Sequence, residues 1–130
     1  MPIISLQVSK DLLERFEKVR NQSGFNSKSK ALRDSIVSFI EKHEQFENLE
    51  GYKIITISLV YPFKDIIVDQ ISDKYAKFHQ IIKTITDWRI AEKKIELILL
   101  VGEIEIIQDF YKELAKINDV ICSIREIIID

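Results

Sequence analysis

Three side chains in this sequence commonly bind transition metals through nitrogen or sulfur, namely His43, His79 and Cys122. Zinc sites in proteins take three or four such ligands, and these residues are far apart in the sequence. A metal site would therefore need carboxylates or a second subunit. Taken singly, His79 is expected at the end of a helix, and Cys122 is expected as a core residue of an apolar strand.

The composition does not favour catalysis. The only glycines, Gly24, Gly51 and Gly102, are too widely spaced for a phosphate-binding loop, which needs several glycines within about eight residues. No nucleophile with an adjacent base, and no cluster of carboxylates with a histidine, can be placed in a cleft. We therefore expect a binding protein with no cofactor, and not an enzyme.

The length and polarity of the chain set its class. It has 130 residues, of which 46% are hydrophobic and 31% charged, so it can bury the core of one domain or of two very small ones. A single cysteine excludes an internal disulfide. No apolar run approaches the roughly 18 residues of a membrane helix, and residues 1–7 lack the features of a signal peptide. The sequence thus predicts a soluble, cytoplasmic protein.

Charge is unevenly distributed along the chain. Residues 1–45 carry 8 Lys and Arg against 6 Asp and Glu, a net charge of +2, whereas residues 46–130 carry 11 against 15, a net charge of −4. A polyanion is therefore expected to meet the first part of the chain.

The first 45 residues predict a strand followed by two helices. Alternation from Ile3 to Val8 predicts a half-buried strand with Ile3, Ser5 and Gln7 on its outer face. Ser9 can cap a helix of about 12 residues that ends near Gly24. Ser27 can cap a second helix, whose apolar stripe is Leu32, Ile36, Phe39 and Ile40.

Such a unit is too small to be stable alone, and its strand has two unpaired edges. It is therefore expected to dimerise by pairing the strand with that of a second copy, in a two-stranded antiparallel ribbon.

The remainder predicts an α+β domain after a linker at residues 46–51. Hydrophobic periodicity gives strands at 53–61, 81–88, 95–101 and 120–129, with helices at 64–78 and 104–116. The order strand, helix, strand, strand, helix, strand is that of the ferredoxin-like fold. Ile98 and Leu99 suit a central strand that is covered on both faces only if another subunit packs on the sheet.

Three runs between Ile4 and Ile40 carry a family resemblance. They are Leu12-Leu13, Gly24-Phe25-Asn26-Ser27-Lys28-Ser29 and Ala31-Leu32-Arg33-Asp34. Together they resemble the ribbon-helix-helix (CopG-like) repressors and are most similar to the nickel-responsive NikR branch. The domain that follows is similar to the ACT-like regulatory domain of that branch.

This resemblance implies DNA contacts and an assembly. In the family the paired ribbon enters the major groove, so Ile3, Ser5 and Gln7 are expected to face base edges. Ser27, Lys28 and Ser29, at the start of the second helix, are expected to contact phosphates. Residues 1–45 would then bind DNA and dimerise, and residues 52–130 would assemble the dimers into a homotetramer.

The resemblance fails at the nickel ligands. Counting back without gaps from Gly102, the family's three histidines and one cysteine fall on Tyr75, Thr86, Trp88 and Lys94. None of these is a good nickel ligand. Either another small molecule acts as effector at the subunit interfaces, where Tyr75 and Trp88 could line a pocket, or DNA binding is constitutive.

We therefore expect a NikR-like transcriptional regulator that binds an operator in double-stranded DNA and does not respond to nickel. The alternative is a ribbon-helix-helix antitoxin of a toxin–antitoxin pair. The long folded C-terminal part argues against an antitoxin, which would usually carry a short tail that folds on binding.

Overall fold

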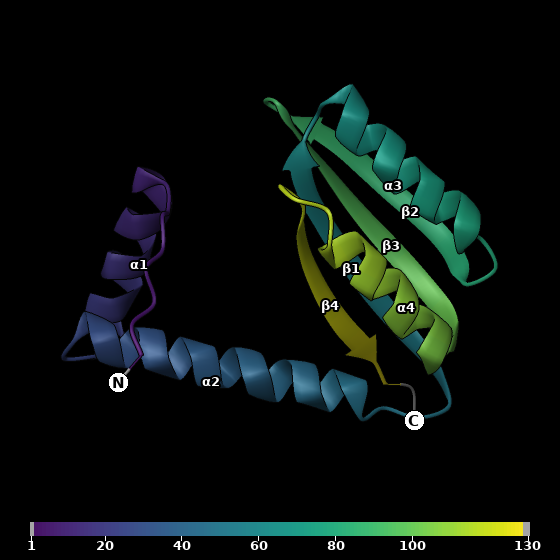
Figure 1. The fold of residues 1–130 in the computed structure, drawn as a ribbon. Helices are drawn as coiled ribbons and strands as arrows, with labels where there is room; N and C mark the ends of the chain where they lie inside the picture. Colours follow the sequence, from purple (N-terminus) through teal and green to yellow (C-terminus); the bar gives the residue numbers. More distant parts are fainter. Residues whose placement is uncertain (1, 129–130) are drawn as a thin grey trace. The chain divides into compact units, whose positions relative to one another are not determined.

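The structure, a computed structural model, describes residues 2–128 and divides the chain into two compact units, one ending at Glu47 and one starting at Asn48 (Figure 1). The described residues form four helices and one four-stranded antiparallel sheet. The sequence placed the linker at 46–51, but residues 46 and 47 belong to a helix, and Phe46 is buried. No helix among residues 2–128 is long and apolar enough to cross a membrane.

The N-terminal unit contains helices α1 (Lys10–Gln22) and α2 (Lys28–Glu47). The predicted caps are confirmed: Ser9 Oγ accepts the Leu12 N–H at 3.1 Å, and Ser27 Oγ accepts the Lys30 N–H at 3.1 Å. Gly24 follows α1 with a φ of +79°, a left-handed conformation that a glycine adopts without steric cost.

The predicted strand at Ile3–Val8 is not formed in the single chain, where residues 2–9 carry no strand hydrogen bonding. A β-strand is defined by hydrogen bonds to a neighbouring strand, and no other segment of residues 2–47 is a strand. The prediction of a half-buried strand is therefore wrong for the single chain, in which residues 2–9 are all exposed.

The C-terminal unit has the predicted order of elements. They are β1 (Tyr52–Pro62), α3 (Asp65–Lys77), β2 (Ile82–Ile90), β3 (Lys93–Glu103), α4 (Ile104–Ala115) and β4 (Ile121–Ile127). The sheet order is β2-β3-β1-β4, so β3 is a central strand as predicted. The predicted end of the last strand, residue 129, lies outside the described residues.

Both helices of this unit cover the same face of the sheet (Figure 1). The buried core lies between this face and the two helices. It consists of Ile55, Ile57, Leu59, Tyr61, Ile98 and Leu100 from the sheet and Ile67, Ile71, Ile104, Ile107, Phe110 and Leu114 from the helices. Gly102 is buried at the end of β3, where an added Cβ would lie 2.7 Å from Ile81 Cγ2. The close approach of these two residues therefore requires glycine.

Within residues 48–128, no element covers the opposite face of the sheet. Its alternate residues on the central strands, such as Val60 and Leu99, are only partly buried, and Trp88 on β2 is 48% exposed. This face is the one that the sequence expected a second subunit to cover.

Candidate functional site

The residues expected to read DNA bases lie in the segment before α1. Ile3, Ser5 and Gln7 are all exposed, and Ile3 is 91% exposed. The segment turns into the helix at Ser9, whose backbone is extended (φ −66°, ψ 157°). The side chains are therefore available to a ligand and to a second strand.

The residues expected to contact phosphate lie at the start of α2. The Oγ atom of Ser27 accepts a helical N–H, and Ser29 is exposed in the first turn. Unpaired N–H groups and the positive end of the helix dipole favour an anion at such a position.

Lys28 forms an ion pair with an acidic residue that the sequence pattern does not single out. Its Nζ lies 2.9 Å from Oε1 of Glu17 on α1, and Arg20 Nη2 lies 2.7 Å from Oε2 of the same carboxylate. Hydrogen bonds from Lys28 and then Arg20 lower the pKa of Glu17. A bridge between helices cannot be recognised before their packing is known. It fixes the Lys28 ammonium beside the start of α2, where a phosphate would have to compete with Glu17.

The helices of this unit expose large apolar side chains. None of residues Lys10–Gln22 is buried in the single chain, and α2 buries only Ala31 and Phe46. The most exposed of these apolar side chains on the two helices include Leu12, Val19, Ile36, Val37 and Phe39. A water-exposed surface of this kind marks an interaction site.

The four positions that the family resemblance aligns with nickel ligands do not converge within one chain. Tyr75 on α3 and Lys94 on β3 meet at Glu96, a buried carboxylate on β3 that is only 3% exposed. The Tyr75 hydroxyl donates a hydrogen bond to Glu96, and Lys94 Nζ lies 3.5 Å from Glu96 Oε1. The sequence analysis missed Glu96, although a glutamate inside the apolar run at 95–101 was a visible signal.

Thr86 and Trp88 lie on the other face of the sheet. Between them stands Asp87, which the strand register places opposite Glu96. Glu96 is buried under the helices, so Asp87 opposite it lies on the same face of the sheet, and the neighbours of Asp87 on the strand lie on the other face.

Two tyrosines surround the buried carboxylate. Burial, followed by the hydrogen bond to Glu96, raises the pKa of Tyr75, and burial with the Glu96 charge raises the pKa of Tyr61. Both phenols are therefore neutral at ordinary pH and can donate to Glu96.

This donor set does not fit nickel. An ammonium group cannot donate electrons to a metal, a neutral phenol is a poor ligand, and two of the four side chains lie on the far face. Within residues 2–128 there is no group of three or more His, Cys, Asp and Glu that could hold a metal ion. His79 Nδ1 lies 3.1 Å from the Ala76 carbonyl, at the end of α3. Burial raises the pKa of Cys122 to about 11, so its thiol is protonated.

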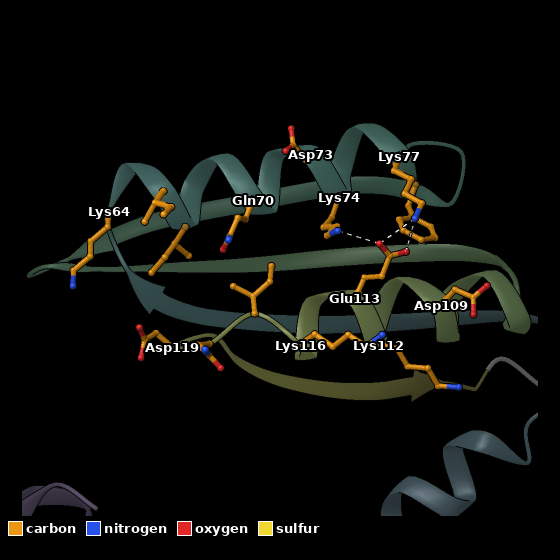
Figure 2. Close-up of a pocket in the computed structure, with 15 residues that line it drawn as sticks. Lys64, Gln70, Asp73, Lys74, Lys77, Asp109, Lys112, Glu113, Lys116 and Asp119 are labelled. Carbon is orange, nitrogen blue, oxygen red and sulfur yellow. Dashed lines mark hydrogen bonds and ion pairs between the residues drawn. The ribbon is translucent and has the colours of Figure 1, made fainter.

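An open groove runs between α3 and α4. Five lysines and four carboxylates line it, together with apolar residues such as Ile66 and Ile117. Figure 2 shows Glu113 of α4 between Lys74 and Lys77 of α3, with Nζ–Oε distances of 3.1 and 2.9 Å. These ion pairs tie the two helices together and lower the pKa of Glu113.

Proteins of similar sequence share a description. One from Dictyoglomus turgidum, named "Putative nickel-responsive regulator", is 33% identical over 117 residues, which are 87% of this chain and 84% of that protein. A protein of the same name from Dictyoglomus thermophilum is 31% identical over 117 residues with the same coverage of 87% and 84%. In Methanothermobacter thermautotrophicus, "Putative nickel-responsive regulator 2" is 23% identical over 119 residues, 90% of this chain and 85% of that protein.

The other comparisons concern the fold. No family model matches the sequence. Among solved structures, an uncharacterized protein of Thermotoga maritima has a TM-score of 0.58 at 12% identity, over 60% of this chain and 100% of that chain. That likeness shows a shared fold alone.

Proposed function

This chain belongs to the nickel-responsive regulator family, and we propose that it is a sequence-specific, DNA-binding transcriptional regulator that does not respond to nickel. The relatives named for this function match most of the chain, including the C-terminal unit. They give no support to the alternative of an antitoxin.

The observation that carries the proposal is the apolar surface of the N-terminal unit. A unit of this size that leaves Leu12, Ile36 and Phe39 exposed needs a second copy to bury them. Dimerisation as a ribbon-helix-helix protein does so and also pairs residues 3–8 with their copy. A single dimer interface would therefore pair the N-terminal segment and cover the exposed apolar face of the helices.

The paired ribbon would present Ile3, Ser5 and Gln7 to the major groove. A glutamine amide can form two hydrogen bonds with an adenine edge, a serine hydroxyl can donate or accept, and an isoleucine can contact a thymine methyl group. Because none of these side chains is charged, most of the affinity would come from phosphate contacts at Ser27, Lys28 and Ser29.

The C-terminal unit would act as an ACT-like assembly domain. Its uncovered sheet face carries Trp88, Leu97 and Ile121, all exposed, and it would pair two dimers into a tetramer. Two ribbons in one tetramer would then contact two half-sites at a fixed spacing.

Operator selection followed by two matched variants tests the DNA interface. Gln7→Ala should weaken binding to the selected operator by about 10- to 100-fold and should affect random DNA much less. The control is Gln45→Ala, an exposed glutamine on α2 outside the proposed interface, which should leave both affinities unchanged. Equal loss on operator and random DNA for Gln7→Ala would refute the base contact.

Calorimetric titration of stoichiometric nickel into the metal-free protein tests the loss of the metal site, with an operator gel shift in parallel. We expect no binding with a submicromolar Kd and no change in operator affinity. Tight binding of one nickel per chain, with a gain in operator affinity, would contradict the proposal.

A further inference from the structure

We propose that Lys94 is the tethered counter-charge of the buried Glu96 carboxylate and that, together with Tyr75, it fixes α3 on the sheet. The C-terminal unit then keeps one conformation whether nickel is present or absent. The regulatory meaning of this inference rests on the proposed function. A C-terminal unit that keeps one conformation favours constitutive DNA binding over control by another effector.

The argument begins with the burial of Glu96. Its carboxylate lies in the layer between sheet and helices, next to the apolar core residues Leu59 and Ile98. A carboxylate in such a place is stable only if hydrogen bonds and a counter-charge replace the lost water. Tyr75 supplies a hydrogen bond, and Lys94 supplies the counter-charge at 3.5 Å. The site is therefore complete with residues of this chain.

The partners of Glu96 fix the position of α3. The other inward side chains of this helix, Ile67 and Ile71, pack through apolar contacts, which tolerate small shifts. The Tyr75 hydroxyl instead bonds a single point on β3, and a shift of the helix would leave Glu96 buried without that donor. Because an unsatisfied buried charge is costly, the hydrogen bond selects one placement of the helix.

The same geometry opposes an external cation. A divalent ion attracted by Glu96 and by Asp87 on the neighbouring strand would have to displace the Lys94 ammonium. The side chain of Lys94 is itself mostly buried, so the ammonium cannot withdraw into solvent without movement of the chain. Its charge is covalently attached and present at every metal concentration.

The test is hydrogen exchange of the α3 amides in the intact protein, measured in EDTA and in stoichiometric nickel chloride. The wild-type protein should give the same exchange rates in both. Tyr75→Phe and Lys94→Met should each speed exchange in α3 by about tenfold or more. The control Asp73→Asn replaces an exposed carboxylate on the same helix and should change these rates by less than about threefold.

A double variant keeps the test decisive if Lys94→Met fails to fold. A neutral amide needs no counter-charge, so Lys94→Met combined with Glu96→Gln should fold and recover slow exchange in α3. The inference is overturned if Lys94→Met leaves α3 exchange unchanged, if the double variant is no better than the single one, or if nickel slows exchange in the wild type.

These exchange measurements use no DNA, so they are independent of the operator-binding test. A protein that fails to bind any operator but shows the expected α3 rates would refute the proposed function and leave the inference standing.

Discussion

Ile36 lies on α2, in the apolar stripe that the proposed dimer would cover, and it is 50% exposed in the single chain. Replacing it by alanine removes most of the apolar side chain from this stripe without adding charge or bulk. Because the residue is half exposed and alanine has a higher helix propensity than isoleucine, the helix itself should persist.

The size of the effect follows from the exposed fraction. Burying a whole isoleucine side chain is worth about 1.5–3 kcal/mol, so burying the exposed half contributes about 0.7–1.5 kcal/mol. A symmetric dimer buries two copies, and the total of about 1.5–3 kcal/mol corresponds to a roughly 10- to 150-fold rise in the dimer Kd.

Sedimentation equilibrium of the intact chain over a wide range of concentrations measures this change. In Ile36→Ala, tetramers should separate at higher concentrations than in the wild type, into dimers held by their C-terminal units. The matched control is Ile66→Ala on α3, where the isoleucine is 68% exposed but lies in the groove beside α4. Equal effects of the two substitutions, or none from Ile36→Ala, would refute the assignment of this face to the dimer.

Three further predictions concern other parts of the chain. Lys28→Ala should weaken binding to operator and random DNA alike and reduce the slope of log Kd against log salt by about one, as measured by gel shifts at several salt concentrations. Since Tyr61 and Tyr75 have raised pKa values in the folded chain, their contribution to stability should be constant below about pH 10 and fall as the pH rises further, because these side chains ionise first in the unfolded chain. Urea unfolding above about pH 10 should show a shallower fall in Tyr75→Phe. Gly102→Ala should lower the free energy of unfolding by about 1–3 kcal/mol, because its Cβ would meet the buried Ile81 side chain, and an unchanged urea midpoint would contradict the packing described.

The elements of the C-terminal unit could be predicted because their side-chain periodicity reflects their own burial. Their ends could not, as the β2–β3 hairpin shows. The strands predicted at 81–88 and 95–101 left residues 89–94 unpaired, but Arg89 pairs with Lys94 and Ile90 with Lys93 in the ladder. The strands continue because backbone pairing extends past the apolar residues, and Ala91, with a φ of 56°, makes the tight turn.

The N-terminal strand shows a different limit. Its alternating pattern encodes a buried and an exposed face, yet the strand depends on hydrogen bonds that no other part of the described chain provides. The alternating pattern in residues 3–8 therefore predicts that this segment pairs with a strand of another chain. Only an assembled protein can test it.

The network at Glu96 was beyond sequence reasoning for a geometric reason. Lys94 and Glu96 stand two apart on one strand, so their shared face could be inferred, but Tyr61 and Tyr75 come from other elements. Register and helix placement bring these hydroxyls to the carboxylate. The spacing of residues in the sequence therefore does not predict that the two tyrosine hydroxyls reach Glu96.

On the proposed function, Tyr75 and Lys94 stand at positions where the family resemblance places metal ligands, and their contacts to Glu96 give them a structural role. A site that merely lost its donors would leave Glu96 buried beside Asp87 without any cation, a state that costs several kcal/mol. Lys94 removes that cost and Tyr75 restores a directed contact between α3 and the sheet. If the proposed function holds, the chain would keep an assembly that spaces two DNA-binding ribbons, and that assembly would not depend on nickel. On the proposed function, operator occupancy would then follow the concentration of the protein and not that of the metal.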